Sequence, residues 1–292
     1  MSNKTAVALG SFDGLHKGHI SVIACTLKYR ECGLEPFILL FDEHPVKVLK
    51  GTAPEEILQP VLRDKILSDM GISKKVISFS EIKDLSPEEF FDKILIGKLN
   101  AGALCCGSNY HFGKNGAGNE HLLKELCEKR GIELTVSPDI SHNGSLISSS
   151  RIRTAIKEGN ILDANAMLGR EFTFKAIVKH GCQRGRLIGA PTINQYFDSG
   201  FVQPKAGVYA SLTVVDGKKY HSVTNIGLRP TFENEDFRSE TCILNYSGNL
   251  YGEDIEVRLL DRIRDEIKFN SEEELKNQIK KDAEFSEKYC VF

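Results

Sequence analysis

The chain has 292 residues, enough for about two domains at roughly 100–200 residues each. Hydrophobic residues make up 41% and charged residues 27%, a balance typical of globular proteins that excludes a disordered chain, a collagen-like repeat and a membrane-spanning protein. The net charge of −2, from 38 basic and 40 acidic residues, gives no electrostatic reason to expect a nucleic-acid partner. The N-terminal apolar stretch is too short for a signal peptide, so we expect a cytoplasmic protein without a membrane partner.

The first half alternates strand and helix patterns. Short apolar runs at Thr5–Leu9 and Phe37–Phe41 indicate buried strands, and helical spacing from Ile20 to Leu27 indicates a helix that stops at Gly33. Further helices are expected at 55–70, 86–99 and 120–130, and further strands at 76–79, 103–106 and 132–136. Strands that are apolar throughout and alternate with helices predict a mostly parallel, Rossmann-like sheet covered on both faces.

After about residue 168 the pattern changes to short strands separated by turn residues. Strand composition is found at 174–179, 207–215, 220–225, 241–246 and 255–260. Asp216-Gly217 between two of these runs is a hairpin signal, and the whole segment predicts a small antiparallel β-barrel. Ser271, followed by three glutamates, is typical of a capping box that opens a C-terminal helix. We therefore divide the chain into an α/β domain at 1–166 and a barrel domain at 167–292.

Eight cysteines are scattered along the chain, and none falls in a C-x-x-C pair. We interpret them as reduced thiols, mostly small core residues such as the adjacent Cys105 and Cys106.

A glycine-rich turn joins the first strand to the first helix. It runs Gly10-Ser11-Phe12-Asp13-Gly14-Leu-His16-Lys-Gly18-His19. Ligands of parallel sheets bind beyond the carboxyl ends of the strands, and a helix start offers free N–H groups to phosphate oxygens. His16 and His19 face the same side of the first turn, where they suit the negative charge that builds on a nucleotide α-phosphate during in-line displacement. A two-histidine metal site, or two histidines that only complete a helix start, are the alternatives.

Four segments of this half resemble the bacterial FAD synthetases of the nucleotidyltransferase superfamily. The turn is similar to G-x-F-D-G-x-H-x-G-H, Phe41–Leu49 to F-x-x-H-P, Gly107–Gly113 to G-x-[ND]-F-x-F-G, and Ile147–Arg153 to I-S-S-[ST]-x-I-R. The four occur in family order and span most of residues 5–160. The resemblance implies that this half transfers AMP from MgATP to FMN, giving FAD and pyrophosphate.

The same resemblance implies which residues bind the substrates. The ATP-binding set would be Gly10, Ser11, Phe12, Asp13, Gly14, His16, His19, Asn109, Ser148, Ser149, Ser150 and Arg153, and flavin contacts would come from Phe41, His44 and Pro45. His16 and His19 would stabilise the transition state, and Asn109 would place nucleotide phosphate or flavin. Serine hydroxyls at a helix start and the Arg153 guanidinium have the chemistry of an anion site, although an ordinary helix cap is the alternative reading of the serines.

A second cluster lies where the barrel pattern begins. Gly185 and Gly189 mark two turns ahead of Pro191-Thr192-Ile-Asn194. Proline fixes the backbone, and the Thr192 hydroxyl and Asn194 amide point to the same side of an extended strand. Both are hard oxygen donors of the kind that Mg²⁺ accepts alongside substrate phosphates. The alternative is an ordinary turn.

Glu240 stands at the head of the apolar run 241–246. A carboxylate that enters an apolar strand is partly desolvated, which suits a general base worth about 10²–10⁴ in rate. The alternative is a strand-end glutamate in water.

Six segments of the second half resemble riboflavin kinases, which are fused C-terminally to FAD synthetase in bacterial bifunctional enzymes. They are Gly169–Phe172, Gly189–Asn194, Pro204–Tyr209, Asn225–Phe232, Glu240–Gly252 and Arg262–Phe269. The resemblance covers about residues 169–282 and implies a barrel that transfers the γ-phosphate of ATP to the riboflavin 5′-hydroxyl.

Residue roles in the barrel follow from the same resemblance. Gly185, Gly189, Pro191, Thr192 and Asn194 would bind ATP, the last two with Mg²⁺, while Glu240 would take the hydroxyl proton and Arg229 and Arg264 would lie near the flavin. Departures from the family pattern are Ala190, Ile193, Gln195, Cys242, Asn245 and Asn249.

The sequence therefore predicts a bifunctional riboflavin kinase and FMN adenylyltransferase whose partners are riboflavin, FMN and ATP. Three alternatives stay open: an adenylyltransferase with an inactive kinase barrel, a flavin-binding regulator without turnover, and a nucleotidyltransferase acting on a pyridine or pantetheine substrate.

Overall fold

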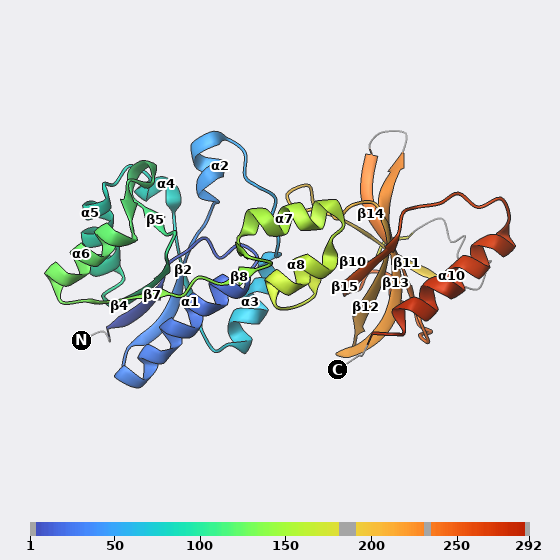
Figure 1. Ribbon diagram of the computed structural model, residues 1–292, viewed down its shortest axis with the longest axis horizontal. Coiled ribbons are helices and arrows are strands. Elements are labelled where there is room, and N and C mark those ends of the chain that lie inside the picture. The colour runs from blue at the N-terminus through green and yellow to red at the C-terminus, as the bar shows by residue number, and fades with distance from the viewer. Residues whose placement is uncertain (1–3, 181–190, 231–234, 290–292) are drawn as a thin grey trace. The chain divides into compact units, whose positions relative to one another are not determined.

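The computed structural model describes residues 4–180, 191–230 and 235–289 (Figure 1). Two compact units emerge, one comprising Met1–Pro54 and Pro60–Ser148, the other Glu55–Gln59 and Ser149–Phe292. Across the described ranges, no helix combines the length and apolar character that a membrane span requires.

A five-stranded parallel sheet forms the centre of the first unit. Its strands, in spatial order, are β3 (Ser73–Ile77), β2 (Glu35–Phe41), β1 (Thr5–Ala8), β4 (Ala101–Gly107) and β7 (Glu133–Ser137). β1 pairs in parallel with both β2 and β4. The chain thus winds outward in one direction through β2 and β3 and in the other through β4 and β7, which places the topological switch point between β1 and β4. The predicted parallel α/β sheet is confirmed.

Helices cover both faces of this sheet. They are α1 (Lys17–Lys28), α2 (Pro45–Lys50), α3 (Pro60–Asp69), α4 (Phe79–Ile82), α5 (Pro87–Glu89), a π-helical segment (Phe90–Lys98) and α6 (Glu120–Arg130). Val7 and Leu9 pack with Phe91 and other residues of the π-helical and α6 segments, while α1 buries Val22 and Ile23 against the other side of the strands. Four short strands complete the unit as two hairpins, β5 (His111–Phe112) with β6 (Gly118–Asn119) and β8 (Ser141–His142) with β9 (Ser145–Leu146).

Local signals explain where the helices start and stop. Ser86 accepts a hydrogen bond from the Glu89 N–H while the Glu89 carboxylate accepts one from the Ser86 N–H, so this capping box fixes the start of α5. The helix predicted at 55–70 begins only at Pro60, because Glu56 pairs with the backbone at Gly200 and Val202 of the second unit. Cys106 and Cys127 lie in the hydrophobic core, as predicted.

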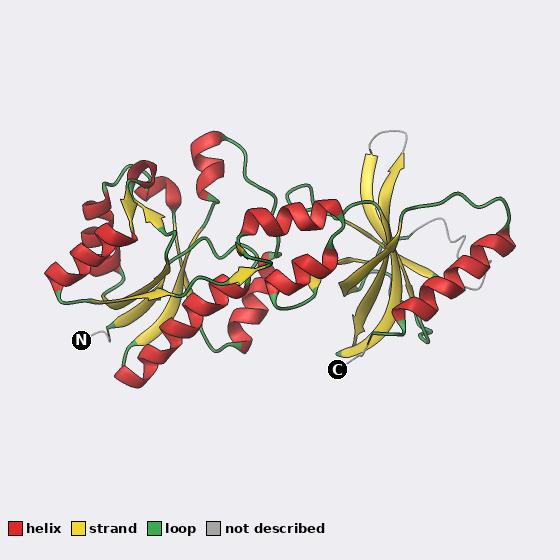
Figure 2. Cartoon of the chain, viewed as in Figure 1, coloured by secondary structure: helices red, strands yellow, loops and turns green. Residues whose placement is uncertain are grey.

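The second unit contains two helices followed by an antiparallel barrel (Figure 2). The helices are α7 (Ser149–Glu158) and α8 (Ile161–Leu168), and the strands, in spatial order, are β10 (Phe172–Ile177), β15 (Asp254–Arg264), β12 (Gly207–Val215), β13 (Lys218–Pro230), β14 (Glu235–Ile243) and β11 (Thr192–Tyr196). The two ends of the sheet approach each other, since the Lys179 N–H donates to the Asn194 carbonyl and the Gln195 amide donates to Ala176 and Ile255 carbonyls. The predicted antiparallel barrel with a C-terminal helix, α10 (Glu272–Ser286), is confirmed.

The two faces of the barrel wall have different neighbours. Inside, the hydroxyls of Ser211, Ser222, Thr224 and Thr241 form a buried hydrogen-bonded network. On the outside, Leu212 and Leu260 pack with Phe285 and other residues near the end of α10. Because side chains alternate along a strand, an inward Thr241 requires its neighbours Glu240 and Cys242 to face outward.

Several strand boundaries in the barrel differ from the prediction, most clearly the end of β13 at Pro230 and the start of β14. β12 and the Asp216-Gly217 hairpin, with φ of 50° and 76°, are as expected. β14, however, begins at Glu235 rather than at 241, because the polar residues ahead of Glu240 pair with β13. The segment from Thr192 to Asn194 is extended, as expected, and it belongs to β11, which continues to Tyr196 and pairs with β14.

Candidate functional site

The histidine pair lies at the switch point of the first unit. His16 is the N-cap of α1, and its Nδ1 accepts a hydrogen bond of 3.3 Å from the His19 N–H. The two imidazole rings stack with their centroids 3.7 Å apart and an interplanar angle of 17°. Gly18 permits this arrangement, since a Cβ there would lie 3.1 Å from the His16 ring. The structure therefore brings His16 and His19 together at a helix N-terminus, where the helix dipole favours an anion.

The turn that carries these histidines is conformationally unusual. Phe12 and Leu15 adopt positive φ of 50° and 41°, and both side chains are fully buried. Positive φ costs free energy for residues other than glycine, and such strain is concentrated at functional sites. The two buried side chains anchor the turn on either side of Asp13 and Gly14.

Other predicted residues of this half follow neighbouring strands at the same edge. Phe41 ends β2 and packs edge-on against Phe79, with ring centroids 5.2 Å apart. His44 is the N-cap of α2, where its Nδ1 accepts from the Val46 N–H at 3.1 Å, and Pro45 is the first helical residue. Asn109 comes just after β4. Because β1, β2 and β4 are parallel neighbours, these residues share the carboxyl edge with the histidine turn.

The serines and Arg153 that were predicted to bind triphosphate lie at the start of α7. Ser148 closes the first unit, whereas Ser149, Ser150 and Arg153 belong to the second. The Arg153 Nε–H donates to the Glu55 carbonyl at 2.7 Å within that second unit. Their role toward ATP stays a prediction.

In the barrel, the strand register assembles the second cluster. Asn194 of β11 is paired with Glu240 of β14, and Thr192 is paired with Cys242 two residues further along. Paired residues share a face of a sheet, so the Thr192 hydroxyl, the Asn194 amide and the Glu240 carboxylate all lie on the outer face. Asn194 itself is buried, with 6% of its surface exposed.

Asn225 is a neighbour that the sequence reasoning did not single out, although it heads one of the recognised motifs. It is paired with Glu240 from the other side, in β13. Its Nδ2 donates to Glu266 at 3.0 Å, and its buried Oδ1 finds no hydrogen-bond partner in the described part of the chain. Glu240 therefore lies between two amides on adjacent strands.

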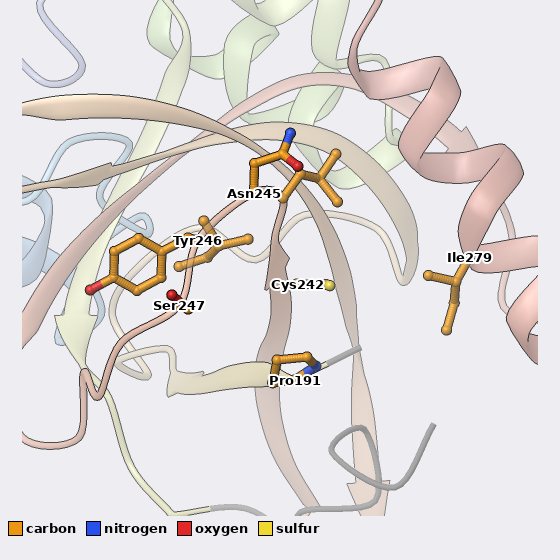
Figure 3. A pocket seen from close by; sticks show the side chains of 8 residues that line it. Pro191, Cys242, Asn245, Tyr246, Ser247 and Ile279 are labelled. Atoms are coloured by element: carbon orange, nitrogen blue, oxygen red, sulfur yellow. The ribbon is translucent and has the colours of Figure 1, made fainter. Parts of the chain in front are cut away.

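Two cavities adjoin this cluster. One of about 330 Å³ is lined by Thr192 and by residues of the loop after β14, Gly248 to Tyr251 among them. The other, of about 430 Å³, lies between the end of β14 and α10. Figure 3 shows the Cys242 thiol in this second cavity between Pro191 and the Asn245 turn, with Ile279 of α10 on one side and Tyr246 and Ser247 on the other. Burial raises the pKa of Cys242, so the thiol is neutral and apolar in character.

Glu240 is partly buried, as expected, but it lies further inside its strand than the predicted run 241–246 implied. It lies inside β14, with 36% of its side chain exposed, and the Arg238 guanidinium of the same strand forms an ion pair with it. Arg238 is a second residue that sequence reasoning missed, since a single arginine in a polar run gives no signal.

The remaining residues predicted for the barrel site lie in different surroundings. Arg264 forms an ion pair of 2.7 Å with Asp282 of α10, whose side chain is only 2% exposed. Gly185 and Gly189 lie outside the described residues, as does the side chain of Arg229, whose backbone is in β13. Asn245, a departure from the family pattern, adopts a positive φ of 56°, which asparagine tolerates well.

A histidine-bearing turn at the switch point of a parallel sheet, and a Thr-x-Asn segment paired with a glutamate on an antiparallel barrel, together define a two-site nucleotide-dependent transferase. Comparison with known families agrees: residues 1–151 match the family profile of FAD synthetase and residues 168–290 that of riboflavin kinase.

Individual relatives match almost the whole chain. The bifunctional riboflavin kinase/FMN adenylyltransferase of Bacillus subtilis is 36% identical, covering 98% of this chain and 92% of the relative, and that of Listeria monocytogenes is 35% identical, covering 95% and 90%. The chain therefore belongs to the bifunctional riboflavin kinase/FMN adenylyltransferase family, which confirms the predicted class of enzyme. A crystal structure from Streptococcus pneumoniae, named a macrolide-efflux protein, has a TM-score of 0.91 and 32% identity and covers 99% of this chain and 96% of that one.

Proposed function

We propose that the chain converts riboflavin to FAD in two steps at two separate sites. Residues 167–292 transfer the γ-phosphate of one ATP to riboflavin, and residues 1–166 transfer AMP from a second ATP to the resulting FMN. The observation that carries this proposal is the register between β11 and β14, which sets Asn194 beside Glu240. The six departures from the family pattern leave Thr192, Asn194 and Glu240 in place, and this supports an active kinase.

In the kinase step, Glu240 acts as the general base. Its carboxylate accepts the proton of the riboflavin 5′-hydroxyl, the hydroxyl oxygen forms a bond to the γ-phosphorus, and the bond from that phosphorus to the bridging oxygen of ADP breaks. The partial exposure of Glu240, two residues along β14 from Cys242 at the edge of the 430 Å³ cavity, leaves it accessible to substrate. Asn225, with its buried Oδ1 directly across from Glu240, is suited to accept a hydrogen bond from a substrate hydroxyl.

Thr192 and Asn194 fit a magnesium-nucleotide complex. Both supply neutral oxygen donors on the same face, and Thr192 lines the 330 Å³ cavity. Mg²⁺ binds few protein ligands and completes its shell with waters and substrate phosphates, so two such donors suffice. When bound, the ion would neutralise charge on the β- and γ-phosphates of ATP.

Flavin and nucleotide would occupy different cavities. The 430 Å³ cavity is lined by Ile243, Ile279 and Tyr246. Cys242, which is two residues from Glu240 on the same face of β14, also lines it. An isoalloxazine ring is planar and largely apolar, so this lining suits it. ATP then occupies the cavity lined by Thr192, and the two substrates meet at Glu240.

In the adenylyl transfer step, the FMN phosphate oxygen attacks the α-phosphorus of ATP and the bond to pyrophosphate breaks. His16 and His19 donate hydrogen bonds to the charge that develops on the α-phosphate, and the α1 N-terminus adds its dipole. The remaining assignments support binding. Gly10, Ser11, Phe12, Asp13, Gly14 and Asn109 contact the nucleotide, Ser148, Ser149, Ser150 and Arg153 bind its triphosphate, and Phe41, His44 and Pro45 contact the flavin.

Purified protein incubated with riboflavin and MgATP tests the proposal directly. Chromatography of the products should show FMN first and FAD later, with no product when EDTA removes magnesium. Flavin that stays bound and unchanged after long incubation would contradict it. We place both reactions in the cytoplasm, where thiols such as Cys106 are kept reduced.

A further inference from the structure

Arg238 and Glu240 are paired along one strand. They lie two residues apart on β14 and therefore on the same outer face. The Arg238 Nη2 donates to Glu240 Oε1. The Arg238 side chain is only 10% exposed, compared with 36% for Glu240, so a largely buried guanidinium holds a more accessible carboxylate.

The contact uses only one carboxylate oxygen. Glu240 Oε2 hydrogen-bonds to no group in the described ranges. A carboxylate has acceptor capacity on both oxygens. The second oxygen is thus available to a substrate hydroxyl while the first is fixed by Arg238.

The flanking strands offer no other charged group in register with Glu240. Its paired neighbours are the amides of Asn194 and Asn225. A glutamate side chain without a partner samples many rotamers. Holding it in one rotamer before the reaction removes the entropic cost of ordering the side chain from the activation barrier of phosphoryl transfer. Arg238 is the residue placed to do this.

We propose that Arg238 is a positioning residue of the kinase site, whose guanidinium orients Glu240 so that Oε2 faces the riboflavin 5′-hydroxyl. The inference rests on the proposed role of Glu240 as general base. Arg238 acts through Glu240 and does not itself touch the substrate.

The barrel contains a matched control. Arg258 and Glu256 are also two residues apart on one strand, β15, and also form a largely buried ion pair, at 2.6 Å with side chains 24% and 9% exposed. Glu256 is paired with Lys175 and Val214 rather than with the site strands. Arg258→Gln therefore removes a comparable ion pair away from the site, together with the longer 3.8 Å contact of Arg258 with Glu171.

The test measures kcat and KM for FMN formation in the full chain, with conversion of supplied FMN to FAD as the internal check on the preparation. Arg238→Gln should lower kcat by about 10–100-fold with the KM values for riboflavin and ATP unchanged. Arg238→Lys should recover most of the loss, and Arg258→Gln should leave kcat unchanged. In a Glu240→Gln background, Arg238→Gln should cause no further loss, because the group it positions has been removed.

The proposal is overturned if Arg238→Gln keeps wild-type kcat, raises either KM instead, or causes an additional loss in the Glu240→Gln background. Wild-type kinase activity in Glu240→Gln would show that Glu240 is not the general base. If Glu240→Gln is inactive while Arg238→Gln is fully active, only the proposed role of Arg238 is rejected. Arg238→Met, which keeps the apolar stem, provides the same comparison if the glutamine variant does not fold.

Discussion

Asn194 lies directly opposite Glu240 in the antiparallel pairing of β11 with β14. The pairing joins two segments 46 positions apart in the sequence, and it puts the amide proposed to bind nucleotide next to the proposed general base. Because both are on strands rather than on a loop, their separation is fixed by the backbone hydrogen bonds of the sheet.

Replacing Asn194 should therefore impair only the kinase step. Asn194→Ala removes the oxygen donor that we propose binds the magnesium-nucleotide complex, and we expect FMN formation to fall about 10²-fold. Conversion of supplied FMN to FAD by the same preparation should be unchanged. Asn270→Ala, an exposed asparagine of the same unit, is the control. Wild-type kcat and KM for ATP in Asn194→Ala would show that the amide has no part in the reaction.

His16 combines a structural and a proposed chemical role, and two substitutions separate them. His16→Ala removes both the imidazole and the N-cap of α1, so we expect a loss of stability of about 0.5–2 kcal/mol as well as of FAD formation. Asparagine is a good N-cap without an imidazole, so His16→Asn should fold with wild-type stability yet form FAD about 10²–10³-fold more slowly. Thermal unfolding and chromatography of FAD measure the two effects. Normal FAD formation by His16→Asn would show that His16 serves only as a helix cap.

Thiol labelling tests whether flavin occupies the cavity beside Cys242. Burial raises the pKa of Cys242 and so lowers its thiolate fraction at any given pH. Iodoacetamide at pH 7.5 should therefore alkylate the exposed Cys32 first, and labelling of Cys242 should accelerate as the pH rises. Riboflavin should slow labelling of Cys242 but not of Cys32, as mass spectrometry of peptides would show. If riboflavin does not change the labelling rate of Cys242, the flavin binds elsewhere.

The ion pair between Arg264 and Asp282 should anchor α10 to the barrel. Asp282 is almost fully buried and also accepts a hydrogen bond of 2.8 Å from Gln278. Asp282→Asn leaves the Arg264 charge without its partner, and we expect a loss of about 2–3 kcal/mol in the unfolding free energy of the barrel. Urea unfolding followed by circular dichroism suits a chain without tryptophan.

Asp254→Asn is the control for this measurement. It breaks the pair with Lys175, in which Asp254 is half exposed, and it should cost no more than about 0.5 kcal/mol. An equal effect of the two substitutions would show that α10 does not depend on Asp282.

Much of the fold could be predicted because its signals are local. Apolar periodicity located the parallel strands, the Asp216-Gly217 turn fixed the β12–β13 hairpin, and Ser86 with Glu89 marked a helix start. At Ser271 the prediction was partly right. Ser271 caps α10, but the Glu274 carboxylate accepts from the Asn270 N–H rather than from Ser271.

The site was harder to predict where it depends on pairing between distant segments. Thr192 and Asn194 were expected on an extended strand, but the sequence gives no signal that this strand, β11, pairs with β14 and so sets Asn194 opposite Glu240. The burial of Asp282 on α10 could not be predicted either, because it depends on an ion pair with Arg264, 18 positions away. The ion pair of Arg238 with Glu240 could be predicted only with the knowledge that β14 extends back to Glu235.

The most direct test of two separate active sites is product analysis of Glu240→Gln. Supplied with riboflavin and MgATP, this variant should form neither FMN nor FAD, yet it should convert supplied FMN to FAD at the wild-type rate. FMN formation at the wild-type rate, or the loss of both reactions in a folded variant, would contradict the account.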